Sequence, residues 1–135
     1  MCPFKQKKFN FSEIKRNFKI NVNIDSGFTQ DSFGDTIKFY KFYDDRSRVI
    51  FSLNDYSKGS TEYDLAIFEI KSNILQCNTP IHYNSTRKDF FELIHTQQTD
   101  CDTIIFLEQK TVSRYYRFEF VNDTLKHIGL EFFLL

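Results

Sequence analysis

Side chains that could bind a metal ion or attack a substrate are few in this sequence and lie far apart. The candidates are His82, His95 and His127, together with Cys2, Cys77 and Cys101. Because no His-x-x-x-His or Cys-x-x-Cys spacing occurs, a zinc site would need ligands from distant segments. An odd number of cysteines without close spacing indicates free thiols rather than a disulfide framework. Cys101 lies between Asp100 and Asp102, and these carboxylates disfavour the thiolate that nucleophilic attack requires.

Acidic residues in one segment are the other candidates for chemistry. Asp25, Asp31 and Asp35 could act as acids or bases, or could hold a cation. Their spacing does not match a calcium-binding loop, and turn formation explains these residue types better. The chain has only 4 glycines, which leaves little room for a glycine-rich phosphate loop. We therefore expect no enzyme activity, no metal site and no cofactor.

The stretch Arg114-Tyr115-Tyr116-Arg117-Phe118-Glu119-Phe120-Val121 has the aromatic and basic character of an RNA-binding strand. Such strands need small glycine positions so that bases can lie against the sheet. Here Glu119 shares the exposed face with Tyr115 and Arg117, and its charge would repel phosphate. Residues 1–20 do contain six basic residues and one acidic residue, a local charge of +5. A solvated chain end explains this charge, with a polyanion-binding arm as the alternative, and we expect no nucleic-acid partner.

Length and composition favour one β-rich domain. A chain of 135 residues can bury a hydrophobic core without help from disulfide bonds or a metal ion. The charges of its 18 basic and 18 acidic side chains cancel. Phenylalanine (17) and tyrosine (7) are abundant, whereas alanine occurs only at Ala66, which disfavours a helical bundle and favours sheet. We expect no membrane span and, without an apolar segment near Met1, a cytoplasmic location. The alternative is the cell envelope, with a lipid anchor at Cys2 if an upstream signal was removed.

Hydrophobic periodicity predicts the elements that must position these side chains. Phe11, Ile14 and Phe18 fall on one face of a short helix over residues 11–18. Residues 20–24 alternate as a strand does, and residues 25–35 are expected to form a loop. Strands are then expected at 36–43, 48–54, 64–71, 103–108, 113–121 and 125–134, with a short extended piece at 74–77.

A second helix is predicted between the two groups of strands. Thr86 and Asp89 form a Thr-x-x-Asp start signal, and the helix should end near 95–98. Its apolar face is expected to comprise Phe90, Phe91, Leu93 and Ile94.

Two parts of the sequence repeat each other. Asp35-Thr36-Ile37-Lys38-Phe39 returns as Asp102-Thr103-Ile104-Ile105-Phe106, and each copy is followed by an apolar run that ends in Asn-Asp. We interpret residues 9–78 and 79–135 as two tandem repeats, each a helix followed by three strands. Short connections favour antiparallel pairing. The predicted fold is α+β: one mainly antiparallel sheet of six or seven strands with two helices on one face, in a single domain over residues 1–135.

The apolar pattern of the last hairpin predicts its register. Placing Phe118 opposite Ile128 keeps the large apolar side chains on one face and favours a three-residue loop at 122–124 over a two-residue Asn122-Asp123 turn. The same register places Tyr115 opposite Glu131 and Glu119 opposite His127 on the other face.

The segments Asn84-Ser85-Thr86-Arg87-Lys88-Asp89-Phe90-Phe91-Glu92-Leu93-Ile94 and Tyr116-Arg117-Phe118-Glu119-Phe120-Val121-Asn122-Asp123-Thr124-Leu125-Lys126-His127-Ile128 carry a resemblance. A helix leading into a three-stranded meander resembles the α+β repeat of the β-lactamase-inhibitor-like and outer-membrane assembly lipoprotein group, over about residues 80–133. Asn84 stands where that group has a glycine. The resemblance implies a non-enzymatic protein that acts by binding another protein.

We expect a non-catalytic protein-interaction module, for example an inhibitor-like or bacterial immunity-type binding protein. Its contact surface would be the sheet face that bears Tyr115, Arg117, Glu119, His127 and Glu131. A solvated face of mixed charge would have the same composition. The alternatives are an envelope lipoprotein that assists assembly and a small-ligand binder with a pocket between helix and sheet.

Overall fold

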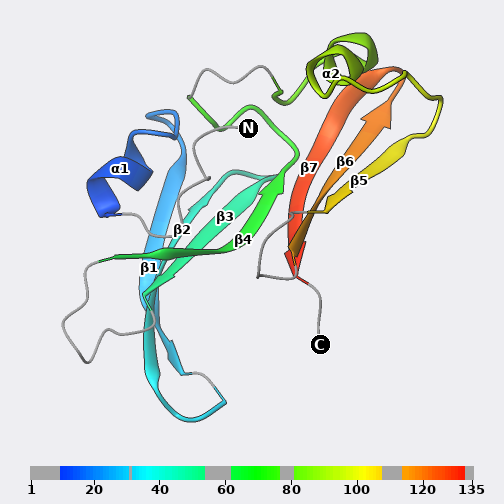
Figure 1. Cartoon of the computed structure of the whole chain (residues 1–135). Coiled ribbons are helices and arrows are strands. Elements are labelled where there is room, and N and C mark those ends of the chain that lie inside the picture. Colours follow the sequence, from blue (N-terminus) through cyan, green and yellow to red (C-terminus); the bar gives the residue numbers. More distant parts are fainter. Residues whose placement is uncertain (1–9, 31, 54–61, 77–80, 108–113, 133–135) are drawn as a thin grey trace.

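A single antiparallel sheet with short helices organises the protein (Figure 1). The computed structural model describes residues 10–30, 32–53, 62–76, 81–107 and 114–132. Its elements are α1 (Phe11–Lys15), β1 (Asn23–Gln30), β2 (Thr36–Tyr43), β3 (Arg48–Leu53), β4 (Asp64–Ile70), α2 (Arg87–Leu93), β5 (Thr103–Leu107), β6 (Arg114–Val121) and β7 (Thr124–Phe132). The seven described strands lie in the order β1-β2-β3-β4-β7-β6-β5. The predicted α+β class is confirmed.

Two meanders meet in the middle of this sheet. The strands β1 to β4 and β5 to β7 each pair with their neighbours in the chain, and β4 pairs with β7. This junction consists of Phe68 opposite Leu130, Glu69 opposite Gly129 and Ile70 opposite Ile128. The apolar members of these pairs point to the same face, so the two halves share one core.

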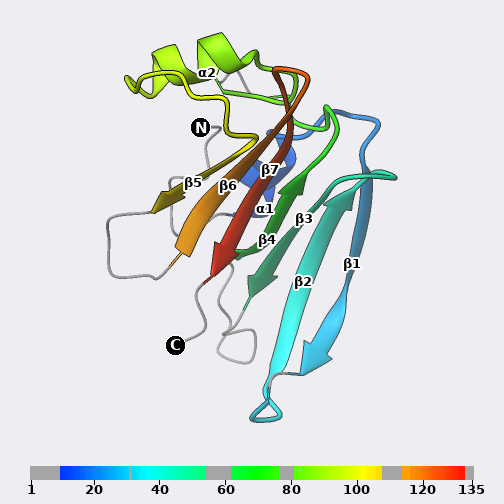
Figure 2. The same ribbon diagram turned by 90° about the vertical axis from the view of Figure 1, so that its right-hand side faces the viewer.

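The core lies on one face of the sheet, under both helices. Near α1, Phe18 stacks on Phe42 with ring centroids 4.3 Å apart. Near α2, the ring of Phe90 lies 4.9 Å from that of Phe118 and 5.1 Å from that of Phe120. In Figure 2, α1 lies behind the sheet and α2 lies over the ends of β5, β6 and β7. No described helix covers the opposite face, which we call the open face.

The N-terminal elements differ from the sequence-based prediction. The segment 25–35 was expected to be a loop, but β1 extends to Gln30 and pairs with β2 along its whole length. Its polar residues form a strand because β2 offers eight partners, and Gly27 leaves room for the ring of Phe39. A Cβ atom at Gly27 would lie only 3.0 Å from that ring.

Both helices differ in detail from their predictions. The helix predicted at 11–18 ends at Lys15, although Ile14 and Phe18 are buried as expected. The predicted Thr86 cap is confirmed, since its side chain accepts a hydrogen bond from the backbone N–H of Asp89. Leu93 was expected in the apolar face of α2 but is exposed.

The repeat interpretation is not confirmed. Strands β2 to β4 and β5 to β7 do form two meanders whose last strands pair. However, among the described residues the first half contains a helix and four strands, whereas the second contains a helix and three strands. The duplication therefore stays a prediction.

The last hairpin satisfies its turn and its register together through a β-bulge. Tyr115 pairs with Glu131 and Phe118 pairs with Ile128, as predicted. The three-residue loop is wrong, because Val121 pairs with Thr124 across a two-residue turn. The register shifts by one residue between Glu119 and Phe120, so β7 accommodates the extra residue and the apolar face is kept.

The two turn residues test this geometry. Asn122 and Asp123 have φ angles of 51° and 63°, which favour asparagine, aspartate or glycine. Asn122→Val should lower the free energy of unfolding by more than about 1 kcal/mol, because a β-branched residue is strained at positive φ. Asn122→Gly should change it by less than about 0.5 kcal/mol. Urea unfolding of both variants checks this, and equal losses would contradict the assigned turn.

Candidate binding surfaces

The five residues predicted for the open face lie together on β6 and β7 and form one network. The Tyr115 hydroxyl donates a hydrogen bond to Glu131, and the other carboxylate oxygen of Glu131 lies 3.5 Å from Nε of Arg117. The Arg117 guanidinium also contacts Glu119, at 3.4 Å. Glu119 in turn lies 2.6 Å from Nδ1 of His127. The register of a single hairpin therefore links all five side chains.

The network is partly withdrawn from solvent. The His127 side chain is 16% exposed and Arg117 is 35% exposed. Hydrogen bonding to His127 lowers the pKa of Glu119, with Arg117 adding to the effect and partial burial opposing it. The hydrogen bond to Glu131 raises the pKa of Tyr115, so its phenol stays protonated as a donor. These contacts fix the side chains relative to one another.

Register extends the open face across the whole sheet. Its charged residues among the described strands are the acids Asp25, Asp64, Glu69, Glu119 and Glu131 and the bases Lys41, Arg48 and Arg117. Five acids and three bases leave a net charge of −2 with His127 neutral. Aliphatic Ile50 and Ile67, opposite each other on β3 and β4, are half-buried between the charged groups. The face is therefore mixed, with an acidic excess.

Arg87 is the residue that sequence analysis missed. It is 4% exposed, and its guanidinium lies 2.9 Å from Asp102 and 2.8 Å from Asp123. It also donates to the carbonyl oxygens of Thr99 and Cys101. Hydrogen bonds and charges from the two aspartates outweigh burial and raise the pKa of Arg87.

Arg87 is buried through contacts with residues that are distant in the sequence. Arg87 is the first residue of α2, and only the three-dimensional fold brings the two aspartates to it. Arg87 fastens α2 to the start of β5 and to the β6–β7 turn, and we assign it a structural role.

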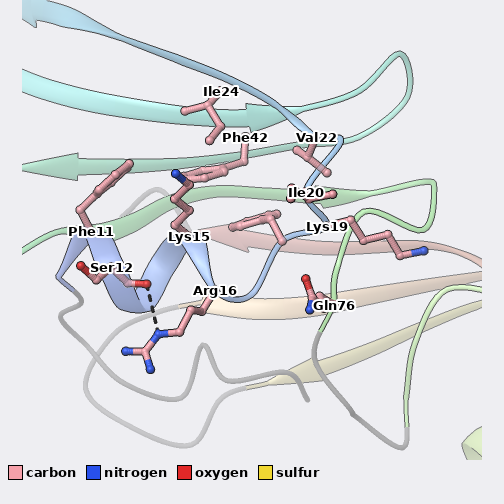
Figure 3. Close-up of a pocket in the computed structure, with 11 residues that line it drawn as sticks. Phe11, Ser12, Lys15, Arg16, Lys19, Ile20, Val22, Ile24, Phe42 and Gln76 are labelled. Carbon is pink, nitrogen blue, oxygen red and sulfur yellow. Dashed lines mark hydrogen bonds between the residues drawn. The ribbon is translucent and has the colours of Figure 1, made fainter.

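A groove lies between α1 and β1–β2 on the helix side of the sheet (Figure 3). Its volume is about 600 Å³, within the range of small-molecule sites. The floor is apolar, and its main residues are Phe11, Phe18 and Phe42. The charged lining residues are all basic: Lys15, Arg16 and Lys19.

Other predicted candidates do not assemble in the described part of the chain. No group of three histidines, cysteines or acidic residues there could hold a metal ion. Cys101 is a free thiol, as predicted, and it is exposed. Several predicted candidates lie outside the described residues: Cys2, Cys77, Asp31 and the three lysines in residues 1–9. The last residue of the extended piece predicted at 74–77 also lies outside them. The described helices are too short and too polar to cross a bilayer.

Comparison with known proteins gave no relatives. Scans against protein-family models, curated proteins and solved structures found nothing that matches this chain.

The Glu119–His127 contact predicts how stability depends on pH. A lowered pKa means that Glu119 stabilises the fold above its ordinary pKa of 4.5, and that this contribution disappears as pH falls through the lower value in the folded state. Glu119→Gln should therefore lose less than about 1 kcal/mol at neutral pH, because the group is partly exposed. The difference from the wild type should shrink in acid. Urea unfolding between pH 7 and pH 3 measures it, with Glu92→Gln on α2 as the control, and a difference that grows in acid would contradict the assignment.

Removing the Arg87 guanidinium should destabilise the protein much more than removing a surface one. Arg87→Met leaves two carbonyl oxygens without their donor and should cost about 2–4 kcal/mol. The matched variant Arg48→Met removes an exposed ion pair, 3.0 Å from Glu69, and should cost less than about 1 kcal/mol. Thermal and urea unfolding of both variants test this, and equal costs would show that Arg87 does not fasten α2.

Proposed function

We propose that this protein is a non-catalytic binding module that docks another protein on its open face. The supporting observation is a continuous sheet surface that no described helix covers, with Tyr115, Arg117, Glu119, His127 and Glu131 held in one network on β6 and β7. Because β6 and β7 each have a strand on both sides, the network rests on a rigid support. Ordering these side chains when a partner binds would therefore cost little free energy.

Charge indicates the chemistry of the partner. The open face has a net charge of −2 among its described residues, so it favours a protein surface with an excess of lysine and arginine. An inhibitor-like or immunity-type protein, which blocks a basic enzyme surface, is the concrete form of this proposal. The resemblance to the β-lactamase-inhibitor-like and assembly lipoprotein group supports it. Asn84, at the group's glycine position, has a φ of 75°, a conformation that glycine readily adopts.

An affinity experiment with matched charge reversals tests the proposal. The variant Glu119→Lys/Glu131→Lys reverses two charges on the open face, whereas Glu92→Lys/Asp100→Lys reverses two exposed charges near α2. Each tagged protein is used to isolate partners from the cells that produce it, and the binding constant of the recovered protein is then measured by calorimetry. We expect a basic partner whose affinity falls at least about tenfold for the first variant only.

Two results would overturn the proposed function. One is equal binding of the partner by both charge-reversal variants while circular dichroism shows that both are folded. The other is the recovery of no protein partner together with a tightly bound metabolite in the purified protein.

A further inference from the structure

We propose that the groove between α1 and β1–β2 binds a single-tailed anionic amphiphile, such as a long-chain carboxylate. This site lies on the helix side of the sheet and shares no residue with the open-face network. It is therefore independent of the proposed protein-binding function.

The floor of the groove suits an alkyl chain. Phe18 and Phe42 are buried and stack on each other, and Phe11 packs 6.4 Å from Phe42. On the side of β1, Val22 is partly buried and Ile24 remains 45% exposed. Covering this exposed apolar surface with a hydrocarbon tail removes it from water, which favours binding.

The rim of the groove suits one negative headgroup. Lys15 extends over the floor beside Phe42 and Ile24, as Figure 3 shows. Lys19 lines the same groove, and neither lysine forms an ion pair with any residue of the described chain. Arg16 is held nearby through its hydrogen bond to the backbone oxygen of Ser12. Unpaired cations beside an apolar floor match a carboxylate attached to a hydrocarbon chain.

The segment that precedes α1 is a poor alternative occupant. Residues 1–9 contain three lysines and no acidic residue, so their charge would be repelled by the basic rim. A volume of about 600 Å³ also fits a small molecule better than a folded partner. Charge and size together therefore select a small anionic amphiphile.

Titration with three matched ligands tests the site. Dodecanoate has the tail and the charge, dodecanol has the tail alone, and butyrate has the charge with almost no tail. Calorimetry on the full chain, below the concentration at which dodecanoate forms micelles, should give saturable binding of one dodecanoate per protein. Dodecanol and butyrate should each bind at least about tenfold more weakly, since each lacks one of the two interactions.

Variants then locate the binding. Lys15→Glu/Lys19→Glu should weaken dodecanoate binding at least about tenfold, and Ile24→Asp should weaken it similarly by placing a carboxylate in the tail site. Lys41→Glu/Lys88→Glu makes the same charge change elsewhere and should leave affinity within about twofold. Lys15, Ile24 and Lys88 are exposed, and Lys19 and Lys41 are partly exposed, so circular dichroism of each variant should show a folded protein.

Three outcomes would overturn the inference: no saturable dodecanoate binding, equal binding of dodecanol and dodecanoate, or equal weakening by the groove and control variants. Adsorption to phosphatidylglycerol vesicles without binding of monomeric dodecanoate would also overturn it, in favour of a membrane surface as the ligand.

Discussion

The pairing of β4 with β7 is the constraint on which the rest of the structure depends. Among the described residues, three pairs form this junction, and they turn two separate meanders into one sheet with one core. Gly129 lies at its centre, where a Cβ atom would meet Nε2 of His127 at 3.4 Å. Glu69 of β4 pairs directly opposite Gly129. Without this junction there would be neither a continuous open face nor a core shared by both helices.

The end of the β6–β7 hairpin reconciles two demands that conflict in the sequence. The apolar pattern requires Phe118 opposite Ile128, and Asn122-Asp123 has the residue types of a two-residue turn. A regular hairpin cannot satisfy both, but a bulge can, and the turn then places Asp123 next to Arg87. The segment before α2 also holds the hairpin in place, because Leu125 exchanges backbone hydrogen bonds with Asn84 and Ser85. Turn, bulge and buried arginine therefore stabilise one another.

Sequence analysis predicted the features that follow from local pattern. Strands β2 and β3, the Thr86 cap and the pairing of Tyr115 with Glu131 came from alternation and capping chemistry. The same alternation placed the five residues of the open-face network on one face of the hairpin. The extent of β1 could not be predicted in this way, because its polar residues form a strand only through pairing with β2. The burial of Arg87 depends on aspartates 15 and 36 residues away and has no local signal.

The zero net charge of the chain conceals two surfaces of opposite character. Acidic residues outnumber basic ones on the open face, whereas the groove beside α1 has three basic residues and no acidic one. Electrostatic attraction acts over about 10 Å at ordinary salt, so each surface responds mainly to its own charges. The two surfaces lie on opposite sides of one sheet, which keeps their charges apart. A neutral composition is therefore compatible with local excesses of either charge, and in this protein the fold places the two excesses on different surfaces.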